Sequence, residues 1–278
     1  MRTIMNLDEI KKHWYEWAES YGTSIRATEK SNTRKSLEVD ALVRSIKSAG
    51  FSEDARFSVL EAGSGTGHNC LELAQQFPNA QIIGFDYVPA MVKNANSLKE
   101  HLGLANIQYF EIDLLNLDVQ LLPSANFDIV FTNRCLINLN SHDLQNKAAV
   151  SLSTLVAGRG SLILGENPQH KFDLQNQMRL KLGLGERTPP EFNLLIDENS
   201  LVQALESNSF TLTELDDFSS LHDTLLYVLI PALNGGVIDY DHPILDIASE
   251  LSIKMMSDHP NAFGMFGQNR MYRFIRSE

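Results

Sequence analysis

The chain has few of the features that mark secreted, membrane-spanning or metal-binding proteins. Only two of its 278 residues are cysteine, Cys70 and Cys135, and their separation in the sequence favours free thiols over a disulfide. No stretch reaches the ~18 consecutive apolar residues of a membrane-spanning helix, and no cationic segment followed by an apolar run begins the sequence. No histidine or cysteine cluster has the spacing of a metal site. We therefore expect a cytoplasmic protein without a metal ion and without a membrane partner.

Basic residues are also in the minority. The 23 Lys and Arg residues are outnumbered by 35 Asp and Glu residues, which gives a formal net charge of -12 at pH 7. Nucleic-acid binding is dominated by basic side chains that neutralise phosphates, so a broad nucleic-acid surface is not expected. The length suffices for one α/β domain with additions and a full hydrophobic core.

A glycine turn directly after a predicted strand is the strongest positive signal. Gly63 and Gly65 lack the Cβ atoms that would hold a ligand away from the backbone, and the helix predicted to follow aims free N–H groups into the same space. Asp86 ends the next predicted strand, about 20 residues later, at the position from which a carboxylate accepts both ribose hydroxyls. The pattern predicts a nucleoside site.

The spacing of the glycines indicates which nucleoside binds. In the dinucleotide fingerprint G-x-G-x-x-G the third glycine would stand at position 68, whereas here Gly67 comes one residue early and His68 follows. Glu61, two residues before the turn, would repel a pyrophosphate and would suit a cationic or zwitterionic ligand. S-adenosylmethionine (SAM) is the natural candidate.

From about Phe57 to Glu166 the chain resembles the class I SAM-dependent methyltransferases, because four motifs occur in the order of that family. The resemblance implies that residues 61–67 wrap the methionine end of the cofactor and that residues 85–87 hold the ribose. It also implies that residues 111–114 bind the adenine and that the end of the strand at 127–134 faces the acceptor. The cofactor-binding residues implied in this way are Glu61, Ala62, Gly63, Ser64, Gly65, Asp86, Tyr87, Met91, Asp113, Leu114, Asn133 and Arg134.

Apolar runs and helical periodicity alternate along the chain as they do in a doubly wound sheet. The resemblance implies a Rossmann-like α/β fold with a seven-stranded sheet whose last strand is antiparallel. Asn140 is expected to cap the helix that follows it. The expected strands are Phe57–Ala62, Gln81–Asp86, Ile107–Ile112, Phe127–Asn133, Ser161–Glu166, Thr211–Phe218 and Arg270–Arg276, and the expected helices include His68–Phe77, Ala90–Leu102, Ser141–Leu155 and Glu198–Ser207.

Two segments are additions to this minimal fold. Residues 1–50 contain a helix at Leu7–Tyr21 with an aromatic stripe and are expected to form a helical lid or cap, although such a stripe is also typical of core packing. Residues 51–278 then form the methyltransferase domain, with a helical insertion at about 221–267. The apolar run Thr224–Leu233 in this insertion suits a roof over the acceptor, a packed helical pair or a homodimer surface.

The chemistry limits which catalytic residues can be assigned. Methyl transfer from a sulfonium is an in-line displacement that depends on holding the nucleophile about 3 Å from the methyl group in a dry pocket. A general base is needed only when the nucleophile must lose a proton. The catalytic candidates are Glu166, at the end of the fifth predicted strand, and Tyr21, at the hinge of the lid. Further candidates for the base are His142, His170 and His222.

Arg134 has two interpretations. It would either hold the cofactor carboxylate or an acidic group of the acceptor, or form a structural ion pair. The leading function is methyl transfer from SAM to an oxygen or nitrogen of a small-molecule acceptor, such as a sugar nucleotide or a natural-product scaffold. The alternatives are a protein or peptide methyltransferase and a non-catalytic SAM-binding scaffold subunit. Intact Gly63, Gly65, Asp86 and Asp113 favour the catalyst over the scaffold.

Overall fold

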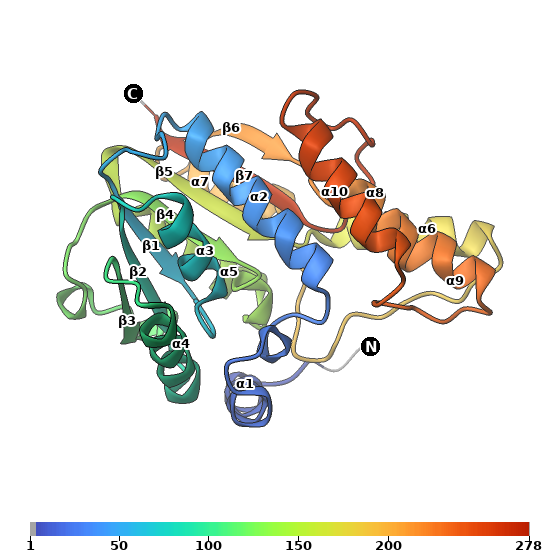
Figure 1. The fold of residues 1–278 in the computed structure, drawn as a ribbon, viewed down its shortest axis with the longest axis horizontal. Helices are drawn as coiled ribbons and strands as arrows, with labels where there is room; N and C mark the ends of the chain where they lie inside the picture. Colours follow the sequence, from blue (N-terminus) through green and yellow to red (C-terminus); the bar gives the residue numbers. More distant parts are fainter. Residues whose placement is uncertain (1–3, 278) are drawn as a thin grey trace.

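A seven-stranded sheet forms the centre of the molecule (Figure 1). The structure, a computed structural model, describes residues 4–277. The strand order is β3-β2-β1-β4-β5-β7-β6; the first five strands are parallel, and β7 runs antiparallel to both β5 and β6. This confirms the predicted sheet with its antiparallel last strand. The strands are β1 Ser58–Ala62, β2 Gln81–Asp86, β3 Ile107–Glu111, β4 Phe127–Asn133, β5 Val156–Glu166, β6 Phe210–Asp216 and β7 Arg270–Arg276.

Helices cover both faces of the sheet because the central strands carry apolar side chains on both faces. Val59 of β1 packs in a core with α2, α3, α4 and α10, whereas its neighbour Leu60 packs in a core with α5 and α7. Within residues 4–277, no helix is both long enough and apolar enough to cross a membrane. The α-helices are α1 Leu7–Tyr21, α2 Asn32–Ser48, α3 His68–Gln76, α4 Pro89–Leu102, α5 His142–Ser153, α6 Gln169–Lys181, α7 Glu198–Glu206, α8 Ser220–Thr224, α9 Ile230–Leu233 and α10 Ile244–Met256.

The N-terminal addition divides between two parts of the molecule. Helix α2 belongs to the sandwich, because Leu37 and Leu42 pack in the same core as β1 and α3. Helix α1 lies apart from the sheet, next to α4 and the short 3-10 helix η1, Ile25–Ala27 (Figure 1). A cap formed by the N-terminal addition is therefore limited to α1 and the residues that connect it to α2.

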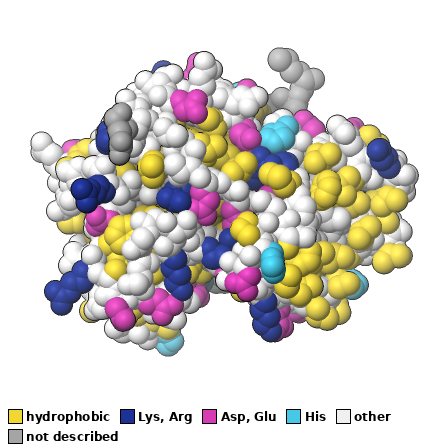
Figure 2. Space-filling view, turned by 90° about the horizontal axis from the view of Figure 1, so that it is seen from above, with side chains coloured by type: hydrophobic (Ala, Val, Ile, Leu, Met, Phe, Trp, Pro, Cys, Tyr) yellow, Lys and Arg dark blue, Asp and Glu magenta, His cyan; other side chains and the backbone are white. Residues whose placement is uncertain are grey.

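The addition between β6 and β7 is a lobe of helices that lies beside α6 and, through α10, beside α2 (Figure 1). The predicted apolar run Thr224–Leu233 is helical, and its middle is a π-helical segment, η5, Leu225–Leu229, with Tyr227 buried. The run is therefore largely internal. Exposed apolar side chains such as Leu233 and Ile247 lie on α9 and α10, and apolar side chains gather on this side of the molecule (Figure 2). A homodimer stays a prediction.

The cap of α5 differs from the prediction. Ser141 is the N-cap residue, because its hydroxyl accepts a hydrogen bond from the backbone N–H of Leu144 at 3.2 Å. Asn140 instead donates its side-chain amide to the backbone oxygen of Met5 at 3.3 Å. The prediction was wrong by one residue, because two neighbouring residues both have capping side chains and a tertiary contact takes up one of them.

Candidate active site

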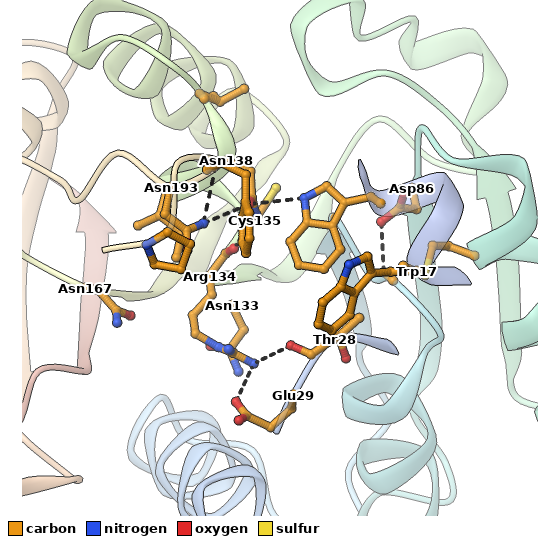
Figure 3. A pocket seen from close by; sticks show the side chains of 18 of the residues that line it. Trp17, Thr28, Glu29, Asp86, Asn133, Arg134, Cys135, Asn138, Asn167 and Asn193 are labelled. Atoms are coloured by element: carbon orange, nitrogen blue, oxygen red, sulfur yellow. Dashed lines mark hydrogen bonds and ion pairs between the residues drawn. The ribbon is translucent and has the colours of Figure 1, made fainter. Parts of the chain in front are cut away.

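A cavity of about 490 Å³ lies at the carboxyl ends of the parallel strands. Asp86 of β2 lies on one side of it and Asn167, which follows β5, on the other (Figure 3). No group of three or more His, Cys, Asp or Glu side chains among residues 4–277 is placed to hold a metal ion. The predicted site residues that line the cavity are Glu61, Gly63, Ser64, Gly65, Asp86, Tyr87, Met91, Asp113, Leu114, Asn133 and Arg134, whereas Ala62, Glu166 and Tyr21 do not line it.

The glycine turn is shaped by protein contacts as well as by the cavity. Gly63 and Gly65 have φ angles of 68° and 53°, in the left-handed region that favours glycine. A Cβ atom on Gly63 would meet the Cβ of Cys135 at 2.9 Å, and one on Gly65 would meet the Cγ2 of Thr28 at 2.8 Å. The turn therefore needs glycine even before a ligand is considered. The sequence pattern alone does not show whether the glycines are needed for these protein contacts or for a ligand.

Asp86 is tied to the turn that it faces. Its carboxylate accepts hydrogen bonds from the backbone N–H groups of Gly65 and Val88, both at 2.9 Å. Burial raises the pKa of Asp86 to about 6, although the backbone N–H groups work in the opposite direction. The two oxygens keep free lone pairs in the cavity wall. The arrangement suits a ligand that donates two hydroxyl hydrogens.

Glu61 is held below the turn. It is 1% exposed, and its oxygens accept hydrogen bonds from the Nδ2 of Asn69 at 2.6 Å and from the thiol of Cys70 at 3.0 Å. Burial raises the pKa of Glu61 to about 7. The carboxyl group is therefore only partly charged near neutral pH. The predicted repulsion of a pyrophosphate by Glu61 is weaker than the sequence suggested.

The residues predicted to bind adenine line the side of the cavity beyond Asp86. Asp113 caps the 3-10 helix η2, Leu114–Asn116, through a hydrogen bond from the backbone N–H of Leu115 to its Oδ1 at 3.0 Å. Leu114 and Met91 are buried beside it. This part of the cavity is a largely apolar slot with one carboxylate, as a flat ring with an amino group requires.

A buried network of charges forms the floor between the N-terminal segment and β4, and the sequence did not reveal it. Glu29 accepts hydrogen bonds from Arg34, with Nη2 to Oε1 at 2.6 Å, and pairs with Arg134 at 2.9 Å (Figure 3). Although burial alone would raise it, Arg134 and Arg34 hold the pKa of Glu29 well below its usual range. Glu38 pairs with Lys35 at 3.1 Å and with Arg134 at 2.8 Å.

Arg134 occupies a strained position in this network. Its φ angle is 53°, which is uncommon for a residue with a side chain. Two buried carboxylates, of Glu29 and Glu38, hold its guanidinium group. Of the two interpretations made from the sequence, the structural ion pair is the one that the contacts show. Arg134 still lines the cavity and contributes positive charge to it.

The candidate bases lie away from the cavity lining. Glu166 is fully buried beneath the site, where its Oε1 accepts hydrogen bonds from the Thr132 hydroxyl at 2.8 Å and from two backbone N–H groups. His222 is fully buried in α8, between Thr33 and Asp223. His142 begins α5 and His170 lies in α6; both are exposed to solvent.

The rest of the cavity wall is lined by residues that the sequence did not single out as a site. Trp14 and Trp17 of α1 line it, and the Nε1 of Trp14 donates to the Oδ1 of Asn138 at 3.2 Å. The sequence left two interpretations of the aromatic stripe on α1, a cap over the site and core packing. The loop between α6 and α7 adds Arg187 and Phe192. The helical spacing of the aromatic residues predicted a stripe on α1, but it did not indicate that the stripe would face the cavity.

The chain is similar to known methyltransferases. Residues 53–183 match the sequence family described as "Methyltransferase domain". EEF1A lysine methyltransferase 2 of Homo sapiens is 30% identical over 143 residues, which are 49% of this chain and 58% of that protein. Trans-aconitate 2-methyltransferase of Deinococcus radiodurans is 32% identical over 84 residues, which are 30% of this chain and 29% of that protein. The chain thus spans less than two thirds of the length of either relative.

A solved structure matches the whole chain. The magnesium protoporphyrin IX methyltransferase from Synechocystis PCC 6803 with bound SAM has a TM-score of 0.58 and 15% sequence identity, and the match covers 100% of both chains. At this identity the likeness concerns the fold.

Proposed function

Residues 53–183 belong to the class I SAM-dependent methyltransferases, and on this premise we propose that the chain transfers the sulfonium methyl group of SAM to an oxygen or nitrogen of a small-molecule acceptor. The family, the enzyme class and the cofactor predicted from the four motifs agree with this membership and are confirmed. The acceptor and the roles of individual residues are the subject of the proposal.

The observation that most supports a small acceptor is the volume and lining of the cavity. A single cavity of about 490 Å³ contains both the predicted cofactor residues and a wall of aromatic side chains. This volume lies within the range of small-ligand sites. Trp14, Trp17 and Phe192 line the cavity, and their rings pack against one another and against His13. Trp14 also packs against the cluster that contains Met91, so the wall reaches the cofactor side. Such a wall suits a compact acceptor enclosed beside the cofactor.

We assign the cofactor to the side of Asp86. Asp86 would accept both ribose hydroxyls, Asp113 would accept the adenine amino group, and the turn at 63–65 would lie against the methionine moiety. SAM supplies an electrophilic methyl group on a cationic sulfur when bound. The buried carboxyl groups of Glu61 and Asp86 lie on the same side of the cavity and suit a cationic ligand.

The acceptor side provides orientation more than proton transfer. Among the described residues that line the cavity from position 167 onward, none is His, Asp or Glu; the polar ones are amides, hydroxyls and Arg187. Such groups hold an acceptor in line with the sulfur–carbon bond but remove no proton. The arrangement therefore favours a nucleophile that already carries a free lone pair at neutral pH, such as a carboxylate oxygen or an uncharged amine.

A protein acceptor is the second candidate. EEF1A lysine methyltransferase 2 is named for a protein substrate and is among the relatives, so peptides belong in the acceptor screen. Release of S-adenosylhomocysteine (SAH) with small molecules, but not with lysine peptides, is the expected result. Turnover with peptides alone would replace the small-molecule proposal. SAM binding without turnover of either class would favour a scaffold.

The cofactor assignment is tested by calorimetry with SAM and SAH. We expect Asp86→Ala to weaken binding at least tenfold, because a charge-assisted hydrogen bond contributes roughly 1.5–3 kcal/mol. Asp54→Ala, which removes an exposed carboxylate outside the cavity lining, is the matched control and should bind normally. Thermal unfolding of both variants separates lost binding from a loosened turn, because Asp86 also accepts hydrogen bonds from the backbone. Unchanged affinity in Asp86→Ala would remove Asp86 from the ribose site.

A further inference from the structure

Arg187 is partly buried, and it differs from the arginines of the chain that are held in ion pairs. It lies in the loop between α6 and α7 and lines the cavity. Its Nη1 donates to the Oε1 of Gln175 and its Nη2 to the Oε1 of Gln268, both at 2.9 Å. The guanidinium carbon lies 3.5 Å from the centre of the Tyr227 ring. All these partners are neutral, and no carboxylate among residues 4–277 forms an ion pair with Arg187.

Neutral partners leave Arg187 without a direct ion pair. Arg34 and Arg134 each pair with Glu29, and Arg270 pairs with Glu198 at 3.0 Å. Arg179 also lacks a carboxylate partner, but it donates to two main-chain carbonyl groups and does not line the cavity. Burial lowers the pKa of Arg187. Asp223 is near enough to raise the pKa of Arg187 but forms no ion pair with it, so an anion of a ligand in the cavity would be the direct partner of this cation.

A second, independent observation lies in the same wall. Asn167 is 7% exposed, and its side-chain oxygen has no hydrogen-bond partner among the described residues. The side chain lines the cavity and stands without a dashed line to any neighbour (Figure 3). A buried polar group without a partner costs about 1–3 kcal/mol, so an unpaired amide oxygen beside a cavity indicates a ligand that donates a hydrogen bond to it.

Both residues lie on the half of the site away from the cofactor motifs. Asn167 follows β5, and Gln268, which holds Arg187, comes shortly before β7; β5 and β7 are neighbours. Asp86 ends β2, which is separated from β5 by β1 and β4. A group bound by Arg187 is therefore remote from the ribose and adenine sites.

We infer that Arg187 binds an anionic oxygen group of the acceptor, a carboxylate or a phosphate, that is distinct from the atom receiving the methyl group, and that the side-chain oxygen of Asn167 accepts a hydrogen bond from a donor group of the same acceptor. The inference rests on the proposed function and narrows its substrate class to acceptors with such an anion. A reacting oxygen paired with Arg187 would be a weaker nucleophile, so the bound anion serves to position the acceptor. The aromatic side chains around it suit an apolar or aromatic body attached to that anion.

The test uses three probes of similar size with the full-length protein saturated with SAH: benzoate, phenyl phosphate and the neutral benzamide. We expect one of the two anions to bind at least about tenfold more tightly than benzamide, and the stronger anion identifies the group. Arg187→Gln should abolish this preference, whereas Arg187→Lys should keep part of it. SAH affinity and thermal unfolding, measured on each variant, should stay near those of the wild type.

A second variant keeps Arg187 in place. Asn167→Asp adds a carboxylate to the same wall and should also abolish the preference for an anion, because it supplies the missing negative charge. Equal binding of all three probes to the wild type, or a preference that survives Arg187→Gln, would overturn the inference. If SAH itself does not bind, the proposed function fails. The preference for the anions can then still be measured without SAH, so the two failures are distinguishable.

Discussion

The two sides of the cavity are built in different ways. The side of Asp86 is formed by residues that directly follow parallel strands, such as Gly63 after β1 and Asp113 after β3, and main-chain N–H groups fix the carboxylate of Asp86. The opposite side is formed by side chains from the loop before α7 and from the lobe between β6 and β7. The first side depends on local backbone geometry, and the second depends on how distant segments pack.

The charge network joins the two sides. Glu29 comes from the segment after α1, whereas Arg134 follows β4, so their ion pair fixes the N-terminal segment over the ends of the strands. Arg34 continues the network to the hydroxyl of Tyr227 in the lobe at 2.8 Å. The acceptor side is thus attached to the sheet through buried charges more than through a continuous apolar core.

The largest expected effect comes from breaking this attachment. Glu29→Gln leaves Arg34 and Arg134 buried without a carboxylate that both share, and should reduce the free energy of unfolding by roughly 3–5 kcal/mol. Glu16→Gln, which removes an exposed pair with Lys12 on α1, should change it by less than about 1 kcal/mol. Urea unfolding measures both. Similar values for the two variants would mean that the network does not hold the N-terminal segment in place.

The second-largest expected effect is on the pH dependence of stability, and it comes from Glu166 at the end of β5. Burial raises the pKa of Glu166 to about 7 in the folded protein. A carboxyl group with a raised folded pKa contributes stability that is full below its unfolded pKa and is lost as the pH rises through the folded value. The free energy of unfolding should therefore fall between about pH 5 and about pH 8. Glu166→Gln should remove up to roughly 3 kcal/mol of that fall.

Urea unfolding of the wild type and the variant across this pH range gives the comparison. Glu72→Gln, on the exposed face of α3, is the control and should leave the pH dependence unchanged. Glu61 has a similarly raised pKa, so part of the fall should remain in Glu166→Gln. If the free energy of unfolding varies with pH in the same way in Glu166→Gln and in the wild type, Glu166 is charged in the folded protein at neutral pH.

The same difference between the two sides explains what the sequence predicted. Strand periodicity places Gly63 and Asp86 at one edge of a parallel sheet, and the hydrogen bond from Gly65 to Asp86 follows from that placement. No periodicity marks Arg187, because it lies in an irregular loop. Nor does any local pattern indicate that Glu29 would meet Arg134. Such contacts depend on the packing of whole elements, and a single sequence does not reveal that packing.

The smallest expected effect separates two aromatic residues of α1. Tyr21 is 40% exposed, contacts the Trp17 ring at 5.1 Å between centroids and does not line the cavity, whereas Trp14 lines it and hydrogen-bonds Asn138. With an acceptor identified in the screen, Tyr21→Ala should therefore change KM and kcat by less than about twofold and stability by less than about 1 kcal/mol. Trp14→Ala should raise KM several-fold more than Tyr21→Ala does. If Tyr21→Ala instead lowers kcat at least tenfold while stability is kept, α1 must move when the acceptor binds and bring Tyr21 into the cavity, and the predicted catalytic role of Tyr21 would then be supported.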